Sequence, residues 1–321
     1  MKKIKFLILG VGLLWLTSPL WSDDGQDSRW GPATSGPFYT GTAEAEPLGS
    51  DFLEPWVYDQ QKPAQHMTSL FMPQRLDLGV GEGWDFSVSI PLVENQLPGV
   101  NASGVGDTTM WLKREMIQDG DTYHFWARPA VSLEALFVLP TGQYQNLSAS
   151  LNGADQTGSG TFDESIQLLM RKRFKPFSLY AQVGDYIENP TSVETGFGFN
   201  NGIQSALHPM RVVNGNLLNY SLCLEQILND QWGLGYILEI SGESQSGQSL
   251  LYGSADSPAW SYLWGDAGLE MTWPNNDSYA VTWGAGMTWP IQEANYPKTY
   301  SPMATVTVNF LGNKGYRGQE D

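Results

Sequence analysis

The sequence has a single cysteine, three histidines and few basic residues, and each shortage excludes a class of protein. One cysteine, Cys223, can form neither a disulfide scaffold nor a cysteine-cluster zinc site. The 321 residues include 17 Lys and Arg against 34 Asp and Glu. A net charge of −17 without a basic run argues against nucleic acid as a partner. Charged residues make up only 16 %, which is low for the surface of an ordinary soluble enzyme.

The three histidines, His66, His124 and His208, leave little material for hydrolytic chemistry. A serine nucleophile needs a histidine within hydrogen-bond reach and a third group that orients it. The chain also has no Gly-x-Ser-x-Gly nucleophile elbow. We therefore expect no catalytic residue, no metal site and no cofactor.

The first 22 residues have the three parts of a secretory signal peptide. Lys2, Lys3 and Lys5 precede an apolar run over 6–16, and the small residue Ser22 is the expected cleavage site. A membrane anchor is the alternative, but it needs about 20 apolar residues. No cysteine follows the run to carry a lipid. Cleavage leaves 14 basic and 34 acidic residues, in a chain expected to be either secreted or inserted as a β-barrel.

Behind this segment, apolar residues recur at every second position, which is the period of a β-strand. In the clearest stretch, 217–228, Leu218, Tyr220 and Leu222 share one face, and the other face carries Asn219, Ser221, Cys223 and Glu225. The same alternation recurs over 123–139, 232–241, 279–289 and 304–310. Helical periodicity is not sustained anywhere, so the chain is expected to be all-β.

The connections between the predicted strands separate two architectures that share this alternation, a soluble sandwich and a membrane barrel. Twelve strands are predicted, over 50–60, 66–80, 83–92, 107–117, 122–139, 161–173, 177–188, 215–228, 232–244, 260–273, 278–290 and 301–310. The connections that begin at 81, 118, 174, 229 and 274 are tight. Those over 93–106, 140–160, 189–214, 245–259 and 291–300 are long, and only 61–65 breaks the alternation. Short periplasmic turns and long extracellular loops are typical of outer-membrane barrels.

The predicted architecture is therefore a transmembrane antiparallel up-and-down β-barrel of about 12 strands over 50–310. A periplasmic segment, 23–49, is long enough to plug its lumen, and a polar periplasmic tail follows over 311–321. Aromatic residues near the strand ends would form girdles at the two membrane interfaces, although tryptophans also fill β cores. These residues are Trp84, Trp232, Trp264, Trp273, Tyr279 and Trp289.

Charged residues that alternate onto the inner face would line the lumen, because charges are costly toward lipid. The candidates are Asp85, Lys113, Glu115, Arg128, Glu134, Asp163, Arg171, Arg173, Glu225, Glu239, Asp266 and Glu270. We expect these residues to form cross-strand ion pairs that stabilise the wall, in preference to a binding site. The functional alternative is a polar path with a weak cation preference. Twelve strands lie between the filled eight-stranded barrels and the open channels of sixteen to eighteen, which favours a narrow or occluded passage.

Three short motifs stand out along the chain. The first is Gly-Pro-Phe-Tyr-Thr over 36–40 with Ala-Glu at 43–44, followed by Pro-Leu-Gly at 47–49 and Phe-Leu-Glu-Pro-Trp at 52–56. The second is Gly-Val-Gly-Asp over 104–107 leading into Trp-Leu-Lys-Arg at 111–114, and the third is Leu-Pro-Thr-Gly over 139–142. Together they resemble a family of bacterial outer-membrane transporters that carries the label of the MetA pathway of phenol degradation. The resemblance implies a barrel that passes hydrophobic molecules, including aromatic growth substrates, and it transfers no catalytic residue. The phenol label reflects genetic neighbourhood, so that substrate is not carried over.

Together these patterns predict a Gram-negative outer-membrane channel or transporter for small, hydrophobic or aromatic molecules that cross by passive diffusion. Its expected partners are outer-membrane lipid, lipopolysaccharide and small solutes. The alternative is a structural or surface-binding barrel that acts through loops 140–160 and 189–214 without transport. The solute, the direction of flow and the oligomeric state are left open by the sequence.

Overall fold

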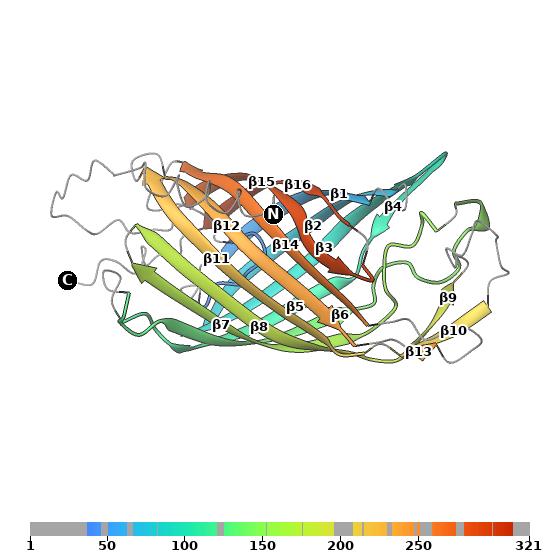
Figure 1. The fold of residues 1–321 in the computed structure, drawn as a ribbon, viewed down its shortest axis with the longest axis horizontal. Helices are drawn as coiled ribbons and strands as arrows, with labels where there is room; N and C mark the ends of the chain where they lie inside the picture. Colours follow the sequence, from blue (N-terminus) through green and yellow to red (C-terminus); the bar gives the residue numbers. More distant parts are fainter. Residues whose placement is uncertain are drawn as a thin grey trace, which may run out of the picture.

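Antiparallel strands make up most of the chain in the computed structural model (Figure 1). The structure describes residues 37–45, 51–62, 67–81, 83–120, 125–151, 153–174, 176–195, 208–213, 215–229, 233–246, 249–250, 259–273, 279–296 and 298–310. The predicted signal peptide, the tail over 311–321, His66, His124 and Trp232 lie outside these ranges. No helix in the described part of the chain has the length and apolar character needed to cross a membrane.

The strands and their bounds follow the chain order, with one short 3₁₀ turn at Ala149–Leu151. The strands are β1 Asp51–Lys62, β2 Met67–Gly81, β3 Trp84–Leu97, β4 Val100–Val105, β5 Thr108–Ile117, β6 Ala130–Leu139, β7 Asp163–Phe174, β8 Phe177–Glu188, β9 Thr191–Thr195, β10 His208–Val213, β11 Leu217–Asn229, β12 Leu234–Gln245, β13 Ser249–Leu250, β14 Trp260–Trp273, β15 Tyr279–Ala294 and β16 Ser301–Phe310.

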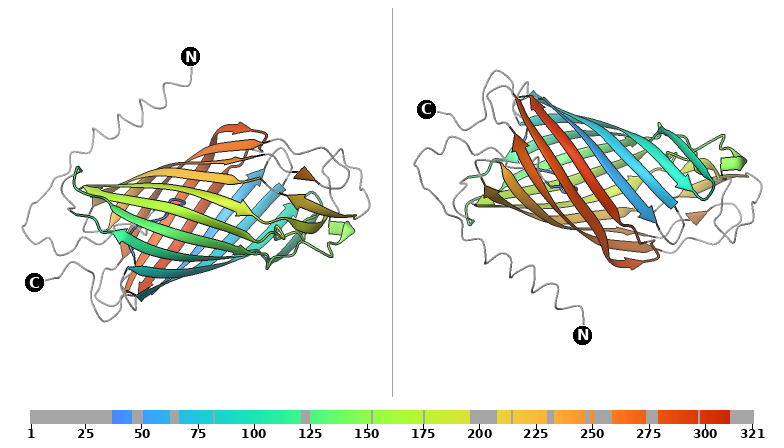
Figure 2. Two further views of the ribbon diagram at one scale, coloured as in Figure 1. Left: turned by 90° about the horizontal axis from the view of Figure 1, so that it is seen from below. Right: turned by 90° about the horizontal axis from the view of Figure 1, so that it is seen from above.

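Twelve of these strands form the barrel that the sequence predicts (Figure 2). Neighbours pair antiparallel in the order β2, β1, β16, β15, β14, β12, β11, β8, β7, β6, β5, β3, and β2 also pairs with β3. The first and last strands meet, with Leu53 opposite Val308. This ring satisfies the backbone of each strand on both sides, as a structure surrounded by lipid requires.

Apolar side chains point outward from the barrel and polar side chains point inward. On β11, Leu218, Tyr220 and Leu222 are 42–51 % exposed, whereas Cys223 and Glu225 are at most 1 % exposed. On β15 and β16 the predicted faces are likewise confirmed, with Trp283 exposed and Thr282 and Thr307 buried. A soluble monomer does not expose so large an apolar surface, so this outer face is suited to lipid.

The two ends of the barrel differ. The end that carries the tight connections 174–177 and 229–234 is called the short-turn end below, and the opposite end is the long-loop end. At the long-loop end, the predicted loop 93–106 is instead a hairpin of β3 and β4, with Gly99 at a φ of +83° in its turn. The outward face of this hairpin is polar, with Glu94 opposite Ser103 and Gln96 opposite Asn101, so the apolar residues expected at every second position toward lipid are missing from the sequence here.

The predicted loops 189–214 and 245–259 also contain strands. β9, β10 and β13 form a small separate sheet beyond the long-loop end (Figure 1). A two-stranded hairpin is marginal in water, and the third strand comes from the neighbouring loop. This pairing between loops distant in sequence could not be foreseen from either loop alone.

One predicted strand, 122–139, is too long. β6 begins at Ala130, and the described residues just before it, 125–129, form a turn and a bend at 125–127 and belong to no strand. Pro129 has no N–H with which to extend the ladder. Trp126, which is 84 % exposed, lies among residues 125–129.

Candidate functional site

The inner wall of the barrel is acidic on one side and carries both cations and acids on the other. Eight of the twelve predicted lumen-lining residues are at most 7 % exposed, namely Asp85, Lys113, Glu134, Arg171, Glu225, Glu239, Asp266 and Glu270. The cations in this set lie on β5 and β7, whereas β11, β12 and β14 contribute only acids. The side formed by β11, β12 and β14 is called the acidic wall below.

The other four candidates are less buried. Glu115, Asp163 and Arg173 are partly buried on β5 and β7. Arg128 is exposed and lies in the connection before β6, so the prediction that it occupies an inward strand position is wrong. The reason is that β6 starts two residues later, after Pro129.

Lys113 lies between two acids on neighbouring strands. It is paired in register with Asp85 on one side and Glu134 on the other. Its Nζ lies 2.8 Å from the Asp85 carboxylate. A second pair, from Arg75 to Asp77 at 2.8 Å, lies along β2. Such pairs compensate the cost of burying each charge alone.

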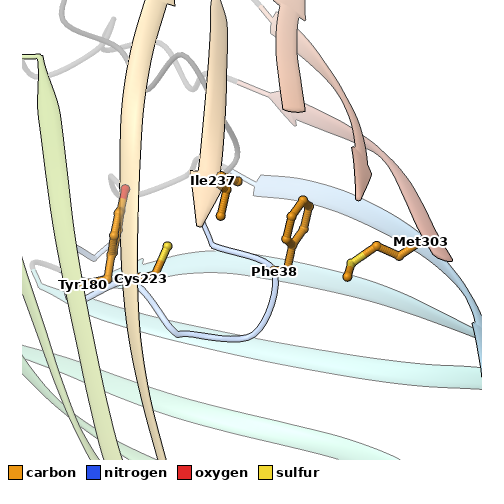
Figure 3. Close-up of a cluster of buried hydrophobic side chains, with 5 residues drawn as sticks. All are labelled: Phe38, Tyr180, Cys223, Ile237 and Met303. Atoms are coloured by element: carbon orange, nitrogen blue, oxygen red, sulfur yellow. The ribbon is translucent and has the colours of Figure 1, made fainter. Parts of the chain in front are cut away.

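Residues 37–45, called the strap below, lie inside the barrel as an irregular segment with bends at 38–40 and 43–44 (Figure 3). Phe38, Thr40 and Ala43 are at most 6 % exposed. The strap belongs to the segment 23–49 that was predicted to be long enough to plug the lumen. The other residues of that segment lie outside the described ranges.

One part of the strap binds the acidic wall through its donors. The backbone N–H groups of Tyr39 and Thr40 donate to the Glu239 carboxylate over 3.1 and 2.6 Å. The Thr40 hydroxyl donates to the same carboxylate over 2.5 Å. A single carboxylate therefore holds three donors of the strap, and hydrogen bonds to a charged acceptor are stronger than neutral ones.

The other part of the strap presents acceptors to the opposite side. The Lys113 ammonium donates to the Thr42 carbonyl over 3.2 Å, and the Ser132 hydroxyl donates to the Ala43 carbonyl. The Glu44 carboxylate accepts from both Arg171 and Arg173. The strap thus crosses the lumen with its polarity matched to the two sides of the wall.

The Phe38 ring anchors the beginning of the strap, ahead of these two polar contacts. It lies in a cluster with Tyr180, Cys223, Ile237 and Met303 (Figure 3). Gly268 leaves room for the ring, because a Cβ there would lie 2.2 Å from the ring's Cζ. Gly268, an inward residue of β14, therefore forms part of the surface on which the strap packs, called the seat of the strap below.

Trp264 points inward, so its prediction as part of an interfacial girdle is wrong. It stacks on Tyr262 with ring centroids 5.2 Å apart and meets Tyr39 edge-on at 5.8 Å. Trp264 lies an even number of residues from the inward residues Asp266 and Glu270 on β14. The alternation of side chains along the strand therefore already indicated that Trp264 faces inward. Burial, followed by the nearby Asp266 carboxylate, raises the pKa of the Tyr39 phenol well above its ordinary value, so this ring stays neutral.

A cavity of about 490 Å³ lies toward the long-loop end. Its apolar lining comes from Met67, Phe71, Pro91, Val93, Leu97 and Val138. Phe71 also packs against the Phe38 cluster, which connects the cavity to the seat of the strap. Much of the polar lining is engaged within the protein: Asn95 donates to the carbonyls of Ala154 and Gln156 over 3.0 and 2.9 Å.

Two of the sequence motifs meet at this cavity and hold loop 140–160 in place. Asp107 accepts from the Gly142 backbone over 2.9 Å and from the Ser159 backbone over 2.6 Å. The Thr141 hydroxyl donates to the Gly106 carbonyl over 3.0 Å. The Gly-Val-Gly-Asp and Leu-Pro-Thr-Gly motifs are therefore parts of one loop anchor.

The fold and its apolar belt define the class of outer-membrane β-barrels. No protein-family model matches the chain, and no curated protein matches it in sequence. Among solved structures, an outer membrane channel from Pseudomonas putida F1 is similar with a TM-score of 0.64 at 13 % identity, over 84 % of this chain and 98 % of that one. At this identity the similarity shows the fold.

Two further barrels are similar at lower scores. The NanC porin has a TM-score of 0.44 at 9 % identity, over 80 % of this chain and 98 % of the porin. A mutant of the TodX monoaromatic hydrocarbon channel has a TM-score of 0.37 at 11 % identity, over 83 % of this chain and 90 % of that one.

Proposed function

We propose that the protein is an outer-membrane channel through which small molecules, including hydrophobic or aromatic ones, diffuse passively, and that the strap closes its lumen at rest. The observation that carries this proposal is a charged barrel interior crossed by a strap whose donors and acceptors match the two sides of the wall. A barrel with a purely structural role has no need of this complementary seat.

The cavity at the long-loop end supports the choice of solute. Its volume of about 490 Å³ is within the range of small-molecule sites. The side chains of Asn95 and Asp107 are hydrogen-bonded to loop 140–160, so apolar side chains form much of the remaining contact surface of the cavity. A small solute with an apolar body fits this lining better than a sugar, which needs many free polar partners.

The test is solute entry into liposomes that contain the refolded mature protein, with a sugar, an aromatic acid and a neutral phenol compared. Protein lacking residues 37–45 is measured in parallel, and both proteins are first shown to be folded by their heat-dependent migration on a gel. We expect faster entry without the strap, and faster entry of the aromatic solutes than of the sugar. Equal entry of all three would indicate a general pore and overturn the solute preference.

If both folded proteins admit nothing above the leak of bare lipid, the channel proposal is wrong. The remaining interpretation is then a structural barrel, or one that binds at its surface through loops 140–160 and 189–214. If the full-length protein is permeable and deletion of the strap does not increase its permeability, the channel proposal stands and only the plugging role of the strap is refuted.

A further inference from the structure

Two arginines converge on one carboxylate at the short-turn end of the lumen. Arg171 and Arg173 are two residues apart on β7, so their side chains project from the same face. Each guanidinium donates to Oε2 of Glu44. The Arg171 and Arg173 side chains are 6 and 16 % exposed, whereas the Glu44 side chain is 28 % exposed. The basic half of the contact is buried in the wall, and the acidic half is the partly exposed side chain of Glu44 on the strap.

The arginines belong to the wall, whose strand pairing does not involve the strap. β7 is paired with β8 along its whole length and with β6 as far as Arg171, and the Arg171 guanidinium lies over the Tyr180 ring at 5.0 Å. Neighbouring acids already have partners: Asp119 binds Lys172 over 2.5 Å, and Glu225 accepts from the Tyr180 hydroxyl over 2.5 Å. Withdrawal of Glu44 removes the carboxylate that is described as ion-paired with both of these buried cations, which is costly unless another anion takes its place.

The site also offers more hydrogen bonds than Glu44 uses. Both guanidiniums bind the same oxygen of the Glu44 carboxylate, and Nε of Arg171 is buried without a hydrogen-bond partner. A carboxylate that is free to rotate can use both of its oxygens, one on Nε and one on Nη of a guanidinium. An unattached carboxylate is thus a better geometric match for Arg171 than the tethered one.

We propose that Arg171 and Arg173 form a binding site for the carboxylate of a small organic anion, and that Glu44 is a built-in competitor for this site. The anion displaces Glu44 and thereby loosens the end of the strap, while the arginines stay paired. The inference rests on the proposed function in one respect, because the anion must be able to enter the lumen. It adds a chemical class of solute and a place where that solute binds.

The experiment measures binding directly, so it does not depend on transport. Folded full-length protein in detergent is titrated by calorimetry with propionate, which reproduces the end of a glutamate side chain, and with its neutral analogue propionamide. Glu44→Gln removes the competitor without touching the barrel wall. Glu293→Gln is the matched control, because the Glu293 side chain is 27 % exposed and also binds a cation, Lys298, outside the strap.

We expect the Glu44→Gln protein to bind propionate about tenfold or more tightly than the original protein, which is the effect of at least one charge-assisted hydrogen bond. Propionamide should bind weakly to both proteins, and Glu293→Gln should behave like the original. Combining Glu44→Gln with Arg171→Gln should abolish the gain, and Arg171→Lys should restore part of it. The lysine variant also guards against a loss that merely reflects misfolding.

Equal propionate affinity with and without Glu44, or equal binding of propionate and propionamide, would overturn the inference. This failure is distinct from failure of the proposed function. Propionate binding without solute entry into liposomes would contradict the channel and leave the carboxylate site standing. Solute entry into liposomes without propionate binding would support the channel and contradict the carboxylate site.

Discussion

Replacing Glu239 with glutamine tests whether the strap is held mainly by one carboxylate. Glu239 accepts two backbone N–H groups and one hydroxyl of the strap. Each hydrogen bond to a charged group contributes about 1.5–3 kcal/mol, against about 1 kcal/mol for a neutral bond. A glutamine keeps one acceptor oxygen and turns its NH₂ group toward a remaining donor. The strap should therefore lose about 2–3 kcal/mol, which corresponds to a roughly 30- to 150-fold shift toward the undocked state.

Single-channel recording in planar bilayers measures this shift as the fraction of time that the channel is open. Glu243→Gln is the matched control, since Glu243 lies at an inward register position of the same strand and its side chain makes no described hydrogen bond to the strap. Glu239→Gln should increase the open fraction strongly, and Glu243→Gln should not. Equal open fractions in the two variants would refute the reasoning that Glu239 holds the strap.

Three further changes test other parts of the structure. Phe38→Ala should raise the open fraction, because loss of a buried ring costs about 3–5 kcal/mol. It should leave the thermal midpoint of the barrel nearly unchanged, because the ring belongs to the strap. An unaltered open fraction would argue against the ring as an anchor. Asp107→Asn removes one of two acceptor oxygens and should weaken the attachment of loop 140–160 by about 1–3 kcal/mol, so limited proteolysis should cut this loop faster than in the original protein. Burial raises the pKa of Tyr296 from its ordinary value of 10.0 to about 12. The folded protein therefore holds this phenolic proton more tightly than the unfolded chain, and the resulting stabilisation is present below pH 10 and lost as the pH approaches 12. Near-UV circular dichroism should report this loss in the original protein, and a Tyr296→Phe variant with the same transition would contradict it.

The strand pattern could be predicted from the sequence because it is a local property. Every second residue must face lipid, so Leu218, Tyr220 and Leu222 reveal both the strand and its outer face without any knowledge of the neighbours. The same parity placed Glu225, Glu239, Asp266 and Glu270 on the inside. It failed at the ends of strands, where β3 leaves the apolar layer and where Pro129 delays the start of β6.

The contacts of the strap could not be predicted, because its residues carry no periodic signal. Gly-Pro-Phe-Tyr-Thr and Ala-Glu were visible as motifs, but their partners lie far along the chain. Tyr39 and Glu239 are 200 residues apart, and Glu44 and Arg171 are 127 residues apart. Which wall residue meets which strap atom depends on the closed ring of strands and on the register between them.

By itself the sequence determined the all-β class, the number of barrel strands and the outward or inward direction of most side chains, since each follows from neighbouring residues along one strand. Only the tertiary structure decided that Trp264 faces Tyr39, that loop 140–160 is anchored on Asp107, and that the wall is acidic on one side and binds the strap's carboxylate on the other. These features arise between segments that barrel closure brings together, and side-chain alternation along one strand carries no information about its distant partners.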